Sequence, residues 1–266
     1  MAQKVALITG ASRGFGRLAA QRLQQAGWRV FGTSRRPGEQ GELPFPLLAL
    51  DVGSDESARN CVAGVLEQAG RIDALVNNAG AVLNGFAEEI SPAEARGQME
   101  TLFFGAVRMI NQVLPLMRRQ GGGRIVNVAS VAGLIGVPYR VFYSAGKFAL
   151  EGYSEGLAFE LRPFGIHVSL VEPGFFRTEL ETRAARAQNH LPEYDRIRRH
   201  IQHYFENGVR RGGDPEKVAR LIQKVLETPR PKLRYPVGKE KGVKWLRTLI
   251  PQRLFAWGAA EYFRLK

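Results

Sequence analysis

One glycine-rich segment near the start of the chain constrains the fold more than any other feature. It spans residues 9–16 (TGASRGFG), follows a short apolar run at residues 4–8 and opens a helical pattern that stops at Gly27. Glycines let the backbone turn tightly and approach a pyrophosphate, whose charge then lies at the N-terminus of the helix. The segment predicts a strand–turn–helix unit that binds a dinucleotide, with the following candidate ligands: Gly10, Ser12, Arg13, Gly14, Phe15 and Gly16.

The rest of the chain alternates short runs rich in Val, Ile and Leu with longer stretches of helical spacing. The apolar runs predict strands at residues 4–8, 29–33, 47–50, 72–76, 124–128, 166–171 and 233–237. Helical patterns lie between them, at residues 14–26, from Asp55 onward, and at residues 92–119, 142–161 and 215–227, with Pro115 as an expected kink. This alternation predicts an α/β fold, a single Rossmann-type domain with a doubly wound parallel sheet and helices on both faces.

The strand–helix alternation also suggests how the chain is divided. Residues 1–238 are expected to form one cofactor-binding and catalytic domain, and residues 239–266 a basic amphipathic extension. Residues 179–213 interrupt the alternation with a polar, Arg-rich segment of helical pattern. Because ligands bind at the carboxyl edge of an open α/β sheet, an insertion after the strand at residues 166–171 is predicted to form a lid over the substrate.

The end of the second predicted strand indicates which dinucleotide binds. A site for NAD(H) usually carries an acidic residue there, which holds the ribose 2′-hydroxyl. This chain has Ser34, Arg35 and Arg36 at that point, no acid before Glu39, and a further cation, Arg13, in the glycine segment. Guanidinium and hydroxyl groups suit a 2′-phosphate. The sequence therefore predicts NADP(H) as the cofactor.

Tyr143 and Lys147 form a second motif, within the helical pattern of residues 142–161. Residues four positions apart lie on one face of a helix, so the ammonium group can lie beside the phenol and lower its pKa from about 10. A tyrosine tuned in this way can exchange a proton with a carbonyl or alcohol oxygen. Ser130, thirteen positions upstream of Tyr143, is the third candidate catalytic residue.

These motifs, in this order, resemble those of the short-chain dehydrogenase/reductase family over nearly the whole chain. Residues 9–16 resemble the family's Thr-Gly-x-x-x-Gly-x-Gly, and Ser130, Tyr143 and Lys147 have the family spacing. Three further segments match. They are Asp51-Val52, which would hold the adenine; Asn77-Asn78-Ala79-Gly80, which would stabilise the sheet and lie along the cofactor; and Pro173-Gly174 with Thr178, which would bind the nicotinamide. Residues 143–152, 172–174 and 234–238 are most similar to the branch of hydroxysteroid and retinol dehydrogenases.

The resemblance implies hydride transfer between a nicotinamide and a carbinol carbon, without a metal ion. Tyr143 would be the general acid/base, Lys147 would lower the tyrosine pKa and hold the nicotinamide ribose, and Ser130 would hydrogen-bond the substrate oxygen. The substrate would be a lipophilic ketone, aldehyde or secondary alcohol, with steroids and retinoids as candidates. Six apolar residues that flank the motifs would line its pocket: Leu134, Ile135, Val137, Phe142, Phe175 and Phe176.

The chain departs from the family pattern at Leu102. The family has a fourth catalytic residue there, an asparagine three positions before a glycine that is Gly105 here. A leucine cannot hold the water that relays protons from the lysine. Either the enzyme works with the three remaining catalytic residues, helped by water or Thr101, or the chain is a catalytically weak or inactive protein that binds or senses NADPH. Gly146 is a second departure, and because glycine in a helix costs up to about 1 kcal/mol, we expect local packing to need the space.

The net charge of +13 is concentrated in the C-terminal third of the chain. Residues 1–178 carry 18 basic and 15 acidic side chains, a net +3, whereas residues 179–266 carry 20 and 10, a net +10. A basic excess can attract nucleic acid, anionic lipid or an acidic ligand. Nucleic acid is not predicted as a partner, because the sequence has no helix-turn-helix, zinc or RNA-binding motif. The tail of residues 239–266 can close the pocket, pack on a second subunit or rest on a membrane surface, in that order of preference.

The remaining expectations concern assembly and compartment. Family members assemble through the helices that here hold Leu102 and Tyr143, so a homodimer or homotetramer is expected. The single cysteine, Cys61, fits a reducing compartment. No apolar stretch is long enough to span a bilayer, and no signal-peptide pattern precedes the first strand, so a cytoplasmic location is predicted.

Overall fold

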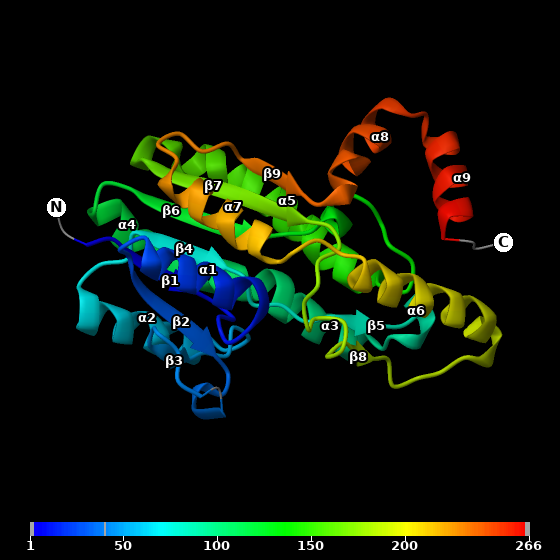
Figure 1. The fold of residues 1–266 in the computed structure, drawn as a ribbon, viewed down its shortest axis with the longest axis horizontal. Helices are drawn as coiled ribbons and strands as arrows, with labels where there is room; N and C mark the ends of the chain where they lie inside the picture. The colour runs from blue at the N-terminus through cyan, green and yellow to red at the C-terminus, as the bar shows by residue number, and fades with distance from the viewer. Residues whose placement is uncertain (1–2, 40, 264–266) are drawn as a thin grey trace.

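The computed structural model describes residues 3–39 and 41–263, which fold around one parallel sheet (Figure 1). Seven strands form the sheet in the order β3-β2-β1-β4-β6-β7-β9. They are β1 (Val5–Ile8), β2 (Arg29–Ser34), β3 (Leu47–Ala49), β4 (Ala74–Asn77), β6 (Gly123–Val128), β7 (Ile166–Pro173) and β9 (Arg234–Val237). The strand order reverses between β1 and β4, which creates a ligand-binding crevice at the carboxyl ends of these strands. The predicted single doubly wound α/β domain is confirmed.

Helices cover both faces of the sheet. Helices α1 (Gly14–Gln25) and α7 (Glu216–Glu227) pack on one face, and α2 (Asp55–Ala69), α4 (Gly105–Arg119) and α5 (Val141–Leu161) pack on the other. Local sequence sets their ends. The Ser54 hydroxyl accepts a hydrogen bond of 3.2 Å from the N–H of Ser57 at the start of α2, and Gly70 ends that helix in a left-handed conformation, with φ +69°.

The predicted helix of residues 92–119 is divided at Leu102. Helix α3 (Pro92–Met99) starts with a capping box between Ser91 and Glu94. A π-helical turn, η3 (Glu100–Phe104), then leads into α4. Helix α4 continues through Pro115. The interruption at Glu100–Phe104 is a separate feature that the sequence did not predict. Turns of this kind occur frequently at functional sites.

Residues 179–213 are only partly helical, contrary to the expected pattern. Helix α6 (Asp195–Arg210) occupies the second half of the segment. The first half contains β8 (Ala185–Arg186), which pairs in parallel with β5 (Leu83–Asn84). This pairing needs an extended backbone at residues 185–186, and it depends on a partner about a hundred residues away, which the local composition does not reveal.

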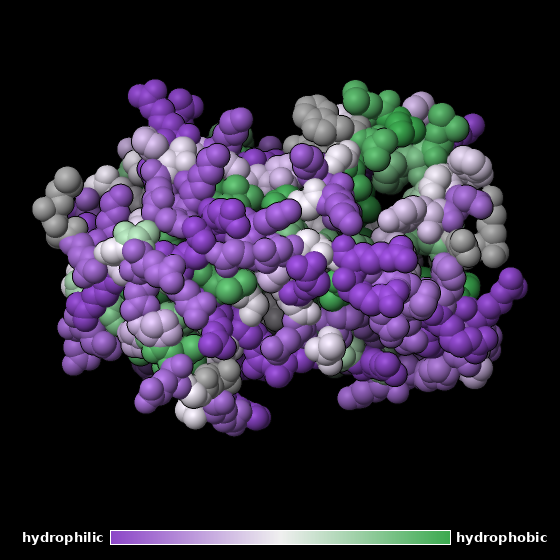
Figure 2. Space-filling view, viewed as in Figure 1, coloured by the Kyte–Doolittle hydropathy of each residue, from purple (hydrophilic) through white to green (hydrophobic). Residues whose placement is uncertain are grey.

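The C-terminal extension forms a helix pair. A short 3₁₀ turn, η7 (Lys239–Gly242), leads into α8 (Val243–Leu249) and α9 (Gln252–Tyr262). The last residues of the predicted extension, 264–266, lie outside the described residues. Figure 2 shows hydrophobic side chains gathered over α8 and the start of α9 at the upper right, on a face that is otherwise mainly hydrophilic. No helix in the described part of the chain is long and apolar enough to cross a membrane.

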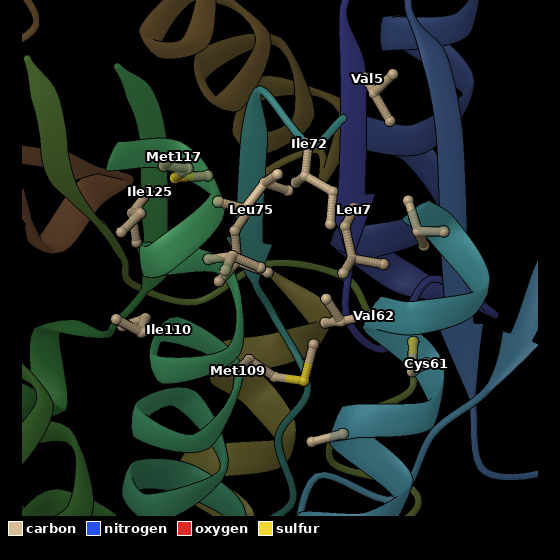
Figure 3. Close-up of a cluster of buried hydrophobic side chains, with 14 of the residues drawn as sticks. Val5, Leu7, Cys61, Val62, Ile72, Leu75, Met109, Ile110, Met117 and Ile125 are labelled. Carbon is tan, nitrogen blue, oxygen red and sulfur yellow. The ribbon is translucent and has the colours of Figure 1, made fainter. Parts of the chain in front are cut away.

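Strand side chains alternate between two cores. Val5 and Leu7 of β1 point toward α2 and α4, whereas Ala6 and Ile8 point toward α1 and α7. Strands that are buried on both faces fit a parallel sheet covered by helices. Figure 3 shows the first core, in which residues of β1, α2, β4, α4 and β6 meet: Leu7, Val62, Leu75, Met109 and Ile125.

Candidate active site

The glycine segment lies between β1 and α1, where two of its glycines pack too closely for any side chain. Gly10 has φ +65°, and a Cβ atom there would lie 3.0 Å from the Cα atom of Ala79. A Cβ atom at Gly16 would overlap the side chain of Asn78 and the carbonyl of Gly10. Gly14 has φ +53°, and the nearest atom to a Cβ there would be a methyl carbon of Thr178 at 4.0 Å. The loop is thus closely packed on its inner side, where Gly10 and Gly16 face residues 78–79. It is open on its outer side, at Gly14.

Hydrogen bonds connect this loop to the segment that follows β4. The Thr9 hydroxyl accepts from the N–H groups of Asn78 and Ala79, at 2.9 Å each. The Asn78 side-chain amide donates to the carbonyl oxygens of Thr9 and Gly10, at 3.0 Å each. These hydrogen bonds therefore hold the glycine loop in position against residues 78–79.

The segment after β7 packs against the glycine loop from the other side. The Gly174 N–H donates to the carbonyl of Val237 at 3.0 Å, which holds the start of this segment against the end of β9. The ring of Phe176 then meets the ring of Phe15 edge-on, with centroids 5.6 Å apart. The two predicted parts of the dinucleotide site, the glycine loop and residues 173–178, lie together at the carboxyl edge of the sheet.

The candidate residues for a 2′-phosphate lie at the ends of β2 and β3. Arg35 and Arg36 are exposed beside Ser34, whose hydroxyl accepts from the N–H of Arg36 at 3.2 Å. Asp51 follows β3 and is exposed, while Val52 is buried. Arg13, the third candidate cation, lies 3.5 Å from Glu179. Ser34, Arg35 and Arg36 thus lie together at the end of β2, whereas Arg13 lies beside the segment that follows β7.

Ser130, Tyr143 and Lys147 meet at the carboxyl end of β6. The Ser130 hydroxyl accepts from the N–H of Ala132 at 3.1 Å, which caps the short turn η4 (Val131–Gly133). A hydrogen bond also connects Ser130 with Tyr143. Lys147 lies one turn further along α5, with its Nζ atom 5.9 Å from the centroid of the Tyr143 ring. The structure thus brings together the three side chains that the sequence predicts to be catalytic.

Burial shifts the pKa values of both α5 residues. Burial raises the pKa of Tyr143, and the hydrogen bond with Ser130 and the charge of Arg140 oppose this shift. Burial lowers the pKa of Lys147 to about 8. The expected net lowering of the Tyr143 pKa is not found, because burial outweighs the contributions that oppose it. The ammonium group donates to the carbonyl of Val128 at 2.7 Å, and burial disfavours its charged form.

Arg140 is a site residue that the sequence reasoning missed. Its side chain is buried, donates to the Asn84 side-chain oxygen at 2.9 Å and forms an ion pair with Glu181. Its guanidinium carbon lies 3.6 Å from the centroid of the Phe205 ring. Arg140 is the N-cap residue of α5, with non-helical backbone angles, and its contacts are with distant segments, so no local motif identifies it.

The predicted lid segment contacts residues 83–95. Glu89 accepts from Arg198 at 2.6 and 2.9 Å, and this hydrogen bonding lowers the pKa of Glu89 to about 2. The ring of Tyr194 stacks on Phe86, with centroids 4.1 Å apart. These contacts, together with the Arg140–Glu181 pair, connect the segment to the start of α5.

The predicted pocket-wall residues divide between several environments. Val137 and Phe175 join an aromatic cluster with Phe205 of the lid segment. Phe142 packs beside Leu83 and other residues near β5. The prediction for Phe176 is wrong, because its side chain is only 4% exposed and belongs to the core between the sheet and helices α1 and α7.

Leu102 lies beside Lys147, at the position where the family has asparagine. A Cβ atom at Gly146 would lie 3.1 Å from the Cβ and 3.2 Å from the Cδ1 atom of Leu102, so the missing side chain at Gly146 makes room for the leucine. Leu102 and Lys147 border a cavity of about 10 Å³, which is roughly the space of one water molecule. Asn77 also borders it, and its Oδ1 atom has no hydrogen-bond partner among the described residues. The Thr101 hydroxyl donates to the carbonyl of Gly97 at 3.2 Å, within its own helix.

A dinucleotide crevice beside a Ser–Tyr–Lys cluster defines the class of nicotinamide-dependent oxidoreductases. The chain belongs to the short chain dehydrogenase family, whose model matches residues 4–189. Membership means that it acts on a CH–OH or C=O group and binds a nicotinamide cofactor.

Three similar proteins illustrate the relationship. A 3-ketodihydrosphingosine reductase from Bacteroides thetaiotaomicron is 41% identical over 90% of this chain and 89% of its own length. Retinol dehydrogenase 8 from Homo sapiens is 37% identical over 88% of this chain and 81% of its own. The crystal structure of a short-chain dehydrogenase from Streptomyces avermitilis is 35% identical, covers 99% of this chain and 97% of its own, and has a TM-score of 0.84. The resemblance to the branch that contains retinol dehydrogenases is confirmed.

Proposed function

We propose that the protein is an NADP(H)-dependent oxidoreductase that acts on a lipophilic ketone, aldehyde or secondary alcohol. The observation that carries the proposal is the meeting of Ser130 and Tyr143, with Lys147 one turn away, beside the glycine loop. The aromatic cluster around Phe205 supports an apolar substrate. The names of the similar proteins, a 3-ketodihydrosphingosine reductase and a retinol dehydrogenase, support the same class of substrate.

The residues present fit a dinucleotide. The outer side of the glycine loop is open at Gly14, and glycine is required at Gly10 and Gly16 because of their close packing. The cofactor would supply or accept a hydride at its nicotinamide when bound. The residues that would hold it are Gly10, Ser12, Arg13, Gly14, Phe15 and Gly16 at the pyrophosphate; Ser34, Arg35 and Arg36 at the 2′-phosphate; Asp51 and Val52 at the adenine; and Asn78, Ala79, Gly80, Tyr143, Lys147, Pro173, Gly174 and Thr178 toward the nicotinamide.

Tyr143 would donate the proton to the carbonyl oxygen during reduction. Its raised pKa keeps the phenol protonated at neutral pH, as an acid requires. Ser130 would hydrogen-bond the same oxygen and stabilise the charge that develops on it. Lys147, with a pKa of about 8, is charged at neutral pH and would hold the ribose hydroxyls.

The test is NADPH oxidation against a panel of hydrophobic ketones and aldehydes. Tyr143→Phe should lower kcat/KM by about 100-fold or more, since a positioned general acid contributes 10²–10⁴. NADPH binding, measured by fluorescence, should change little in this variant. Tight NADPH binding without turnover of any carbonyl would instead favour the alternative, a catalytically weak or inactive NADPH-binding or sensing protein, which Leu102 at the asparagine position motivates.

Cofactor choice has a separate test. Arg35→Ala combined with Arg36→Ala should raise the Kd for NADPH more than tenfold, because each charge-assisted hydrogen bond contributes about 1.5–3 kcal/mol. The Kd for NADH should stay nearly constant. Arg230→Ala is the matched control, because Arg230 is also exposed but lies before β9, at the opposite edge of the sheet. Equal losses for the two cofactors would refute the NADP(H) assignment.

We also propose a homodimer or homotetramer in the cytoplasm. Phe104 and Phe159 are 45% and 71% exposed, near the helices through which family members assemble. The single cysteine, Cys61, supports a reducing compartment.

A further inference from the structure

The C-terminal helix pair is anchored to segments that adjoin the catalytic residues. The Glu240 carboxylate accepts from the N–H of Phe175 at 3.3 Å, just after the proposed nicotinamide segment. Arg247 donates to the carbonyl of Leu134, in the loop after Ser130, and its guanidinium lies 5.2 Å from the centroid of the Phe148 ring. The helix pair therefore starts at the carboxyl edge of the sheet, beside the site.

The other end of the pair reaches the lid segment. The hydroxyl groups of Tyr262 and Tyr204 form a hydrogen bond of 3.2 Å. The buried ring of Phe263 packs on Tyr204, with centroids 5.4 Å apart. Helices α8 and α9 thus connect the α5 side of the site with α6, as their position beside α5 and α6 in Figure 1 indicates.

The outer side of this pair exposes large apolar side chains. Leu246 and Leu249, one turn apart on α8, are 51% and 75% exposed, and Leu254 at the start of α9 is 59% exposed. Figure 2 shows these helices as the main hydrophobic area of that face. Single exposed leucines are ordinary, but a gathering of them on two adjacent helices marks a contact surface.

The charge around these leucines identifies the chemistry of the partner. Within the described residues, 239–263 contain five Lys and Arg and two acidic residues, one of which, Glu240, already accepts from Phe175. Lys239, Lys241 and Arg253 are exposed. A helix with leucines on one side and cations around them suits the interface of a bilayer that contains anionic lipid. A second copy of this surface fits less well, because two faces of the same positive charge repel each other.

We propose that α8 and α9 form a docking surface for a bilayer with anionic phospholipids. The leucines enter the boundary between headgroups and acyl chains, and the long basic side chains extend toward the phosphates. One consequence rests on the proposed function: a lipophilic substrate dissolved in the bilayer would reach the protein beside its catalytic residues.

The experiment is cosedimentation of the full chain with lipid vesicles. We expect binding to vesicles of phosphatidylcholine mixed with phosphatidylglycerol, weaker binding to phosphatidylcholine alone, and a loss of binding as salt increases. Leu249→Asp combined with Leu254→Asp should weaken binding at least tenfold. Both side chains are exposed, so the fold should be kept, which circular dichroism checks. Phe164→Asp is the matched control, an exposed apolar residue before β7 at the opposite end of the sheet.

Three results would overturn the proposal. The first is the absence of wild-type binding to either kind of vesicle, and the second is equal binding by the wild type and the double variant. The third is a concentration-dependent increase in molar mass, seen by light scattering without lipid and abolished in the double variant, which would make the surface a contact between two copies. Vesicle binding is measured without turnover, so a failure of the proposed enzymatic function would leave this result unchanged.

Discussion

Substitution of Gly146 by alanine should destabilise the wild-type protein, although alanine is the better helix former. Gly146 lies inside α5 and faces Leu102 of the π-helical turn. Intrinsic helix propensity favours alanine by about 1 kcal/mol. A Cβ atom, however, would lie 3.1 and 3.2 Å from two carbons of Leu102, and overpacking of this kind costs about 1–3 kcal/mol. The net change in the free energy of unfolding should therefore be a loss of about 0–2 kcal/mol.

Truncation of the leucine should reverse part of this effect. Leu102→Ala alone should cost about 2–5 kcal/mol, because Leu102 is only 2% exposed. This truncation removes the contact between a Cβ atom at position 146 and the Cδ1 atom of Leu102, but the contact with the Cβ atom of residue 102 remains. The overpacking is therefore only partly relieved. We expect Gly146→Ala to be about 1 kcal/mol more favourable in the Leu102→Ala background than in the wild type.

The assay is urea unfolding followed by circular dichroism, at one protein concentration, for the wild type, both single variants and the double variant. Gly152→Ala is the matched control, since Gly152 lies in the same helix and a Cβ there would meet no atom within 4 Å. It should stabilise the protein by up to about 1 kcal/mol in either background. Overpacking at Gly146 would be refuted if Gly146→Ala stabilised the wild type as Gly152→Ala does. It would also be refuted if the effects of Gly146→Ala and Leu102→Ala added up, within about 0.5 kcal/mol, to the effect of the double variant.

Four further predictions follow from the buried groups and the exposed surface. The folded-state pKa of Lys147, about 8, lies below its unfolded value of about 10.4, so the unfolded state binds more protons between these values. The raised pKa of Cys61 acts in the opposite direction over part of this range. The free energy of unfolding of the wild type, measured by urea unfolding relative to Lys147→Met, should therefore rise with pH across that window. Arg234→Met should cost about 3–5 kcal/mol, visible as a lower Tm, because Arg234 forms ion pairs with Glu151 and Glu172, both buried; an unchanged Tm would contradict this. Cys61, whose pKa burial raises to about 11, should react slowly with a thiol reagent in the native protein and rapidly in denaturant, and fast native labelling would argue against the buried position. Phe159→Glu should lower the molar mass measured by light scattering, whereas an unchanged oligomer would exclude this residue from the contact.

The sequence predicts the sheet and the position of the catalytic residues well, because both depend on local signals. Each motif directly follows an apolar run, and the carboxyl ends of parallel strands meet at one edge, so Gly10, Asn78 and Ser130 had to lie close together. The spacing of Tyr143 and Lys147 likewise requires one helix face.

What the sequence could not predict depends on contacts between distant segments. The Lys147 ammonium group donates to the carbonyl of Val128, a backbone atom that no motif identifies. Burial, which the motif does not reveal, raises the pKa of Tyr143 against the expected direction. The two-residue strands β5 and β8 have no periodicity of their own. Phe176 is apolar and adjacent to the site in sequence, but its burial against Phe15 depends on how the segment after β7 turns.

The structure around Leu102 separates the effect of the missing asparagine on the fold from its effect on the chemistry. The π-helical turn is present with leucine at this position, so an asparagine side chain is not needed to form it. Packing supports the turn instead. A Cβ at Gly105 would lie 2.8 Å from a methyl carbon of Val52, and the absence of a Cβ at Gly146 makes room for the leucine. Because the fold compensates for the leucine in this way, the substitution should affect proton transfer behind Lys147 more than the stability of the domain.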